Sequence, residues 1–131
     1  MIVLDTHALI WWVSGARRLS ARARRAIGSA LRQGPLIASA ISLFEIATAV
    51  RRGRLELRPP LEQWLNDLSR LPELRLEPVS ADIAQAAGRF PDPMPGDPAD
   101  RIITATAIAL RARLITADER LRKSSLVESV W

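Results

Sequence analysis

Apolar residues occur along the chain in two patterns, short continuous runs and longer stretches with a repeat of three to four residues. The short runs are typical of buried strands, and the longer stretches predict helices that bury one face. The expected strands cover residues 1–4, 36–38, 74–79, 114–116 and 126–127. The expected helices lie between residues 6 and 13, 20 and 34, 40 and 52, 60 and 68, 80 and 88, and 98 and 111, with a short one from 118.

Residues with strong preferences at helix ends support these boundaries. Ser20 and Ser39 can each cap the helix that follows, and Gly53 is expected to terminate the helix that ends near residue 52. Residues 91–96 carry a proline at every second position and then a glycine, which excludes regular structure and predicts a loop.

The alternation of strands and helices predicts an α/β fold with a mostly parallel central sheet that helices cover on both faces. The segment 74–79 alternates apolar and polar residues and contains Pro78, so it is expected near a sheet edge. Folds of this kind bind their ligands at the carboxyl ends of the strands. Asp5 and Asp118 both follow expected strands and are therefore expected at that edge.

Four acidic motifs are spaced along the chain, and we expect the fold to bring their carboxylates together. They are 4–7 with Asp5, 44–46 with Glu45, 97–101 with Asp97 and Asp100, and 116–118 with Asp118. Carboxylates gathered near a core repel one another, so a stable cluster implies a compensating cation. Oxygen ligands favour Mg²⁺, with Mn²⁺ as the alternative.

Composition and charge narrow the class of protein. The 131 residues are 48% hydrophobic, enough for one domain over residues 1–131 with a core of its own. The chain has no cysteine and a single histidine, His7, which excludes thiolate zinc sites and a histidine-rich metal cage. No stretch is long and apolar enough for a membrane span, and we expect a cytoplasmic protein without a membrane partner.

The net charge is +5, and all but one of the 19 basic residues are arginine. The arginines are grouped, which suits a nucleic-acid partner, although a solvated helix face would show the same grouping. The candidate RNA-binding residues from the two groups are Arg17, Arg18, Arg22, Arg51 and Arg52.

The motifs together resemble those of PIN-domain ribonucleases, and more narrowly the VapC toxins of type II toxin–antitoxin (VapBC) systems. The similarity lies in residues 5–12, 97–107 and 114–118, in matching order, and it spans essentially the whole chain. It implies a PIN-like three-layer fold and a catalytic, metal-binding set made of Asp5, Glu45, Asp100 and Asp118. The periodicity of the helix around Glu45 by itself favours a solvent-facing position, so the resemblance alone makes this residue a ligand or a water-activating base.

Several residues next to the acidic set have two possible roles. Asp97 is expected to cap the helix that Pro98 opens, and Asp100 lies in its first turn, where the helix dipole also favours a carboxylate. Thr6 and Thr116 either orient a carboxylate or cap a helix. For His7 we expect packing against the core and assign no chemistry.

The roles of Arg101 and of two tryptophans also stay open. Arg101 either neutralises carboxylates, contacts phosphate or pairs on the surface. Trp11 and Trp12 are candidates for a partner groove, against the default of core burial.

The function that follows from the resemblance is that of a metal-dependent endoribonuclease toxin. A cognate VapB-type antitoxin would inhibit it, and the protein would form a homodimer. The alternative is a nucleic-acid-binding module that uses the arginine clusters and has no turnover. A phosphatase with Asp5 as nucleophile is disfavoured, because that chemistry needs an acid at the position of His7.

Overall fold

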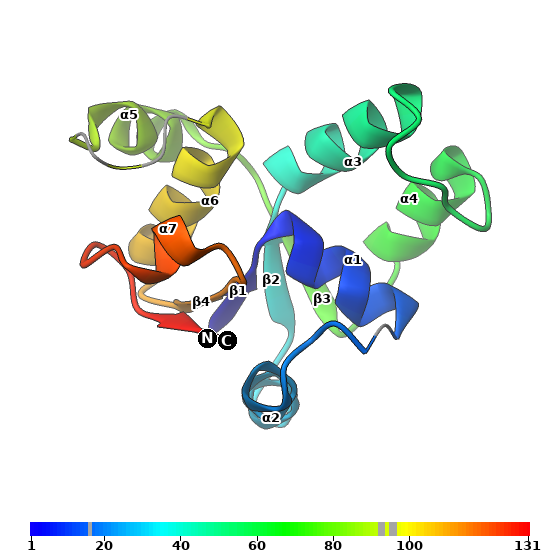
Figure 1. The fold of residues 1–131 in the computed structure, drawn as a ribbon, viewed down its shortest axis with the longest axis horizontal. Helices are drawn as coiled ribbons and strands as arrows, with labels where there is room; N and C mark the ends of the chain where they lie inside the picture. The colour runs from blue at the N-terminus through cyan, green and yellow to red at the C-terminus, as the bar shows by residue number, and fades with distance from the viewer. Residues whose placement is uncertain (16, 92–93, 95–96) are drawn as a thin grey trace.

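A five-stranded sheet with the order β3-β2-β1-β4-β5 runs through the middle of the molecule in the computed structural model (Figure 1). The structure describes residues 1–15, 17–91, 94 and 97–131. Every strand pairing in this part of the chain is parallel. The strands are β1 (Ile2–Leu4), β2 (Leu36–Ser39), β3 (Leu74–Glu77), β4 (Arg113–Ile115) and β5 (Ser129–Val130).

Helices cover both faces of this sheet, as Figure 1 shows with α5, α6 and α7 on one side and α1, α3 and α4 on the other. The helices are α1 (Thr6–Ser14), α2 (Ala21–Leu31), α3 (Ile41–Arg51), α4 (Leu61–Ser69), α5 (Ala81–Arg89), α6 (Pro98–Ala109) and α7 (Glu119–Arg122). The predicted three-layer α/β arrangement is therefore confirmed.

Two apolar clusters hold the layers together, and β1 contributes to both because its side chains alternate between the faces. Ile2 and Leu4 join the cluster that includes α1, α2, α3 and α4. Val3 joins the cluster around Ile103 of α6 and Leu121 of α7. Burial on both faces explains why this strand is a continuous apolar run in the sequence.

The helix ends expected at Ser20 and Gly53 are confirmed, and the cap expected at Ser39 is not. The Ser20 hydroxyl accepts a hydrogen bond from the Ala23 amide at the start of α2. The expectation that Ser39 caps α3 is wrong, because Ser39 is the last residue of β2 and the N-cap is Ala40, although the Ser39 hydroxyl accepts from the Ile41 amide at 3.2 Å. Gly53 takes a left-handed conformation after α3, with φ 70°, which side chains other than glycine rarely adopt.

Two expectations about the elements need correction. The last strand is not at residues 126–127 but three residues later, because Val127 packs into the cluster with Leu121 and leaves Ser129 and Val130 to pair with β4. Helix α2 ends at Leu31, before the expected stop at Gly34. The loop expected over 91–96 lies mostly outside the described residues.

None of the helices in the described part of the chain combines the length and the apolar character that a membrane crossing requires.

The packing of α6 against the sheet gives a first prediction. Replacing the buried Ile103 (1% exposed) by alanine should lower the free energy of unfolding by about 2–5 kcal/mol, because it leaves a cavity under the helix. Ile108 of the same helix is 40% exposed, and Ile108→Ala should cost less than about 1 kcal/mol. Urea denaturation measures both, and equal losses would contradict the packing described.

Candidate active site

The carboxyl ends of β1 and β4 meet at one edge of the sheet and bring Asp5 beside Thr116. The two strands are in register, and the Asp5 amide donates to the Ile115 carbonyl at 3.1 Å. Asp5 is only 7% exposed. Its carboxylate caps α1 by accepting from the Ala8 amide at 2.8 Å, and it also accepts from the Thr116 hydroxyl. Asp5 therefore serves as a helix cap and still points into the edge of the sheet.

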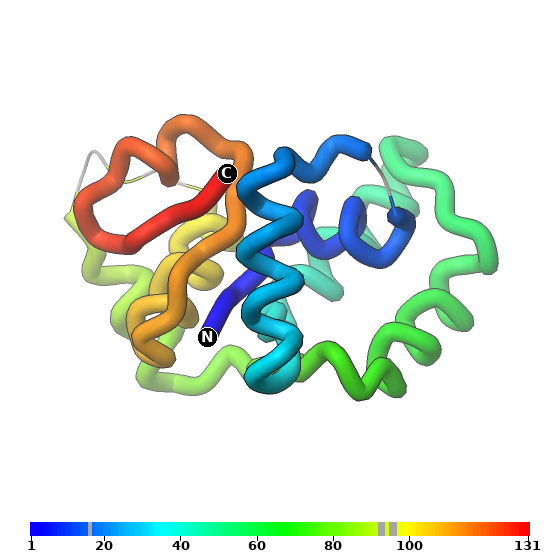
Figure 2. The backbone as a smooth tube through the Cα atoms, turned by 90° about the horizontal axis from the view of Figure 1, so that it is seen from below, coloured from blue at the N-terminus to red at the C-terminus, as the bar shows by residue number. Residues whose placement is uncertain are grey.

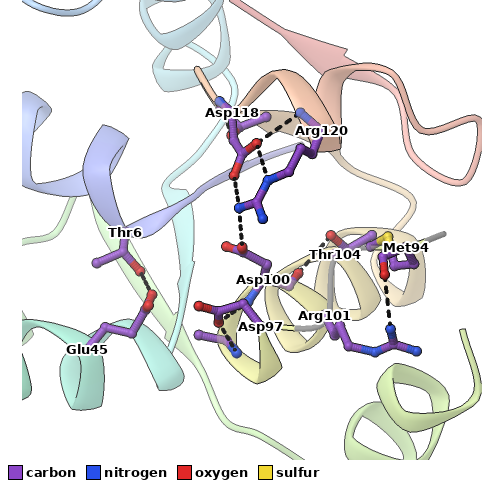
Figure 3. A network of polar contacts seen from close by, with 11 residues as sticks. Thr6, Glu45, Met94, Asp97, Asp100, Arg101, Thr104, Asp118 and Arg120 are labelled. Atoms are coloured by element: carbon purple, nitrogen blue, oxygen red, sulfur yellow. Dashed lines mark hydrogen bonds and ion pairs between the residues drawn. The ribbon is translucent and has the colours of Figure 1, made fainter. Parts of the chain in front are cut away.

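Glu45 reaches the same edge from α3. The Thr6 hydroxyl donates to the Glu45 carboxylate (Figure 3). It also lies 2.8 Å from the hydroxyl of the fully buried Ser42. The solvent-facing position favoured by periodicity is therefore wrong for Glu45, since the polar stripe of Ser42 and Glu45 faces α1. The residue that does face solvent is Phe44, which is 67% exposed.

Asp97 and Asp100 come from the start of α6. The Asp97 carboxylate accepts from the amides of Ala99, at 2.8 Å, and of Asp100, at 3.3 Å, which confirms the expected N-cap. The Asp100 side chain points toward Arg120 and Asp118, as Figure 3 shows. Asp118 itself caps α7 through the Arg120 amide, at 2.9 Å.

The side chains line one cavity of about 380 Å³. Its lining comprises Asp5, Thr6, His7, Trp11, Glu45, Asp97, Asp100, Ala117, Asp118 and Arg120. The four residues expected to form the acidic set thus lie together, although they come from four separate parts of the chain. Below, this space is called the acidic cavity.

The pKa values of the carboxyl groups in the acidic cavity reflect the crowding of negative charge there. Burial, together with the nearby carboxylates of Asp97, Asp118 and Glu45, raises the pKa of Asp100 to about 7. Burial also raises the pKa values of Asp5 and Glu45, against the opposing effect of hydrogen bonds from Thr116 and Thr6 respectively. At neutral pH this space therefore holds carboxylates whose ionised forms lack sufficient neutralisation.

Arg120 is a residue of the cavity that reasoning from the sequence missed. Its guanidinium contacts the Asp118 carboxylate at 2.9 Å and lies 3.6 Å from that of Asp100 (Figure 3). The hydrogen bond from Arg120 lowers the pKa of Asp118. Because Arg120 pairs mainly with Asp118, it leaves the proton affinity of Asp100 high. Its position two residues after an acidic motif was the only signal in the sequence.

Other candidate residues lie elsewhere or act differently. The guanidinium of Arg101 donates to the carbonyls of Ala87, Phe90 and Met94 and points away from Asp100 (Figure 3). The expectation that His7 is packed is wrong, since it is exposed, with its ring 5.7 Å from that of Trp11.

The five candidate RNA-binding arginines are all exposed, and none lines the acidic cavity. Arg51 and Arg52 lie at the end of α3, more than a turn beyond Glu45. Arg18 lies closer to the acidic cavity, because its guanidinium carbon is 5.8 Å from the centre of the ring of Trp11, which lines that cavity. Arg17 precedes it in the chain.

The donor set suits a hard divalent cation. It offers carboxylate oxygens with threonine hydroxyls behind them, which is the chemistry that Mg²⁺ and Mn²⁺ prefer. Within the described ranges, however, no three histidine, cysteine, aspartate or glutamate side chains are gathered closely enough to hold a metal ion as they stand. The guanidinium of Arg120 occupies the space between Asp100 and Asp118, so closer approach of these two carboxylates to a cation requires it to move.

Comparison with known proteins places the chain in a family. The PIN domain model matches residues 2–125. The chain is 40% identical over 121 residues to Ribonuclease VapC22 of Mycobacterium tuberculosis, covering 92% of this chain and 89% of that protein.

Solved structures share the fold at lower identity. VapBC2 from Rickettsia felis, bound to a DNA fragment from its promoter, has a TM-score of 0.69 at 19% identity and covers 98% of this chain and 97% of that one. FitAcB from Neisseria gonorrhoeae has a TM-score of 0.68 at 22% identity, with 98% and 96% covered. A toxin–antitoxin complex from Klebsiella pneumoniae has a TM-score of 0.67 at 23% identity, with 97% and 95% covered. The chain belongs to the PIN-domain family and, within it, to the VapC branch.

The raised pKa of Asp100 predicts how stability depends on pH. The folded protein holds this proton up to about pH 7, whereas the unfolded chain releases it near pH 3.9, so without divalent cations stability falls as the pH rises between these values. Asp100→Asn removes the ionisation and should stabilise the cation-free protein at pH 8 by about 1–2 kcal/mol, with little effect at pH 4. Thermal unfolding in EDTA measures the difference.

The exposed Asp67 of α4 provides the matched control for this change of charge. Asp67→Asn should alter stability by less than about 0.5 kcal/mol at either pH. An equal gain from Asp100→Asn at pH 4 and pH 8 would contradict an origin in buried charge.

Proposed function

We propose that this protein is a metal-dependent endoribonuclease toxin of a toxin–antitoxin pair, acting in the cytoplasm as a single PIN domain over residues 1–131. The observation that carries the proposal is the convergence of Asp5, Glu45, Asp100 and Asp118 in one cavity with raised pKa values for three of them. A cluster that resists full ionisation is suited to bind a divalent cation.

The roles of the residues follow from their contacts. Asp5, Glu45, Asp100 and Asp118 would hold Mg²⁺ or Mn²⁺, which supplies neutralisation of phosphate charge and a lowered pKa for water. The hydroxyls of Thr6 and Thr116 orient Glu45 and Asp5 through hydrogen bonds. Asp97 holds the first turn of α6 so that Asp100 faces the cavity.

RNA is the substrate that charge and kinship support. The net charge of +5 favours a polyanion, and the 40% identical relative is named a ribonuclease. Attack by water on the phosphodiester should leave a 5′-phosphate and a 3′-hydroxyl, because this chemistry does not use the ribose 2′-hydroxyl as nucleophile.

A groove between α1 and α2 is the proposed seat of a VapB-type antitoxin. It has a volume of about 290 Å³ and an apolar lining that includes Trp11, Trp12, Leu19 and Ile27, with Arg24 at its side. Complexes named toxin–antitoxin or VapBC occur among the solved structures with this fold, which supports such a partner. We also propose a homodimer, because the chain belongs to the VapC branch.

Cleavage of RNA tests the proposed activity. With purified, antitoxin-free protein and total cellular RNA, Mg²⁺ or Mn²⁺ should give discrete cuts with 5′-phosphate ends, and EDTA should abolish them. Asp5→Asn should reduce the rate by about 100-fold or more, because the charge stabilisation that the cation supplies is worth several kcal/mol. The exposed Asp67→Asn should cleave like the wild type.

Two results would overturn this function. Ends with a 2′,3′-cyclic phosphate would exclude attack by water as the mechanism. RNA binding without any turnover, equal in wild type and Asp5→Asn, would favour a non-catalytic nucleic-acid-binding module.

The antitoxin groove is tested on the purified complex. Trp12→Ala should speed dissociation of the antitoxin by about tenfold or more, because a buried tryptophan at an interface commonly contributes 2 kcal/mol or more. Phe44→Ala removes another large aromatic side chain, 67% exposed on α3, and should leave the rate unchanged. Unchanged dissociation of Trp12→Ala would remove the groove from the interface.

A further inference from the structure

A second cavity, lined with positive charge, lies beside the acidic cavity. It has a volume of about 490 Å³ and is formed where α2, α7 and the end of β5 come together. Its lining comprises Arg22, Glu119, Arg122, Lys123, Ser129 and Trp131. Figure 2 shows the end of the chain running alongside α2, which brings these distant segments into contact. Below, this space is called the basic cavity.

The charge of the basic cavity is not balanced from within. Three cationic side chains face one anionic side chain, Glu119. In the part of the chain that the structure describes, neither Arg22, Arg122 nor Lys123 forms an ion pair. All three are exposed, so their charges are open to a ligand. Like charges held together in this way attract a polyanion, and Arg and Lys are the side chains that bind phosphate.

Two structural links connect the basic cavity with the acidic one. The first is α7, because Arg120 near its start lines the acidic cavity, whereas Arg122 and Lys123 at its end line the basic cavity. The second is an aromatic contact. Trp11 lines the acidic cavity, Trp131 lines the basic cavity, and their rings are 5.6 Å apart. An RNA strand that leaves the acidic cavity past these two rings would therefore reach the cationic side chains of the basic cavity.

We propose that the basic cavity binds the phosphates of the RNA strand that flank the cleavage site, so that Arg22, Arg122 and Lys123 hold the substrate while the acidic cavity cuts it. This inference rests on the proposed function, since it names where that substrate continues. Phosphate contacts of this kind position a strand without reading its sequence. They therefore set how long an RNA must be to bind well.

Binding to single-stranded RNA is the test, and it uses the full protein with the Asp5→Asn change so that the probe stays intact. In this background the triple variant Arg22→Gln, Arg122→Gln, Lys123→Gln should weaken binding of a 20-nucleotide RNA by about tenfold in 0.1 M salt. The slope of log affinity against log salt should also become shallower by about 2, because three phosphate contacts contribute about 0.7 each. Fluorescence anisotropy measures both quantities.

Matched controls separate a specific site from net charge and from misfolding. Arg70→Gln, Arg89→Gln, Arg113→Gln removes three exposed arginines, one just after α4, one at the end of α5 and one on β4, and it should leave affinity within about twofold of the parent. The double variant Arg22→Lys, Arg122→Lys keeps the charge and should retain most of the affinity. Both triple variants should unfold at temperatures close to that of the parent.

The outcomes keep this inference apart from the proposed function. In the otherwise wild-type protein, the basic-cavity triple variant should raise KM for a long RNA and leave kcat unchanged, whereas Asp5→Asn should lower the cleavage rate strongly. Equal affinities of the two triple variants would overturn the inference even if the protein cleaves RNA. Unchanged RNA affinity with weakened antitoxin binding would assign the basic cavity to that protein partner instead.

Discussion

The structure depends on one electrostatic constraint, the gathering of several carboxylates at the edge of a parallel sheet where water has limited access. Because β1 and β4 are parallel neighbours, the residues that follow them meet in space, and Asp5 is buried there to 7% exposure. Glu45 and Asp100 add further negative charge from α3 and α6. Full ionisation of such a set is unfavourable, as the pKa of about 7 for Asp100 indicates.

Other side chains of the protein neutralise the clustered carboxylates only in part. Hydroxyls of Thr6 and Thr116 stabilise the ionised forms of Glu45 and Asp5, and the guanidinium of Arg120 neutralises Asp118. In the part of the chain that the structure describes, the Arg120 side chain is 64% exposed and paired with the carboxylates of Asp118 and Asp100, so it can move away without disturbing the core. The remaining negative charge at Asp5, Glu45 and Asp100 is what a divalent cation would balance. Positive charge lies outside this cavity, on α2 and at the end of α7, where we propose that an RNA strand binds.

The parts of this arrangement that follow from local pattern could be predicted from the sequence. Asp5 and Asp118 follow apolar runs, and parallel strands present such residues at one edge. The capping role of Asp97 follows from its place before Pro98. The position of Glu45 could not be predicted from periodicity, because hydropathy treats Ser42 and Glu45 as a solvent-facing stripe. It does not reveal that α1 offers Thr6 as a polar partner between two packed helices.

Other features depend on long side chains and on register. Arg120 was missed because a flexible arginine on a four-residue helix has no pattern that fixes where its guanidinium lies. The last strand was expected at the more apolar residues 126–127, whereas pairing with β4 selects Ser129 and Val130. Resemblance to a family supplied what periodicity lacked for Glu45.

The most direct test of the central claim, that the acidic cavity is a divalent cation site, is a titration of Mn²⁺ followed by electron paramagnetic resonance. Addition of the protein at pH 8 should reduce the signal of free Mn²⁺ in a saturable way. Asp5→Asn and Asp100→Asn should weaken this binding, and it should also be weaker at pH 6, where a proton competes at Asp100. An undiminished Mn²⁺ signal at pH 8, or equal binding by the wild type and both variants, would contradict the claim.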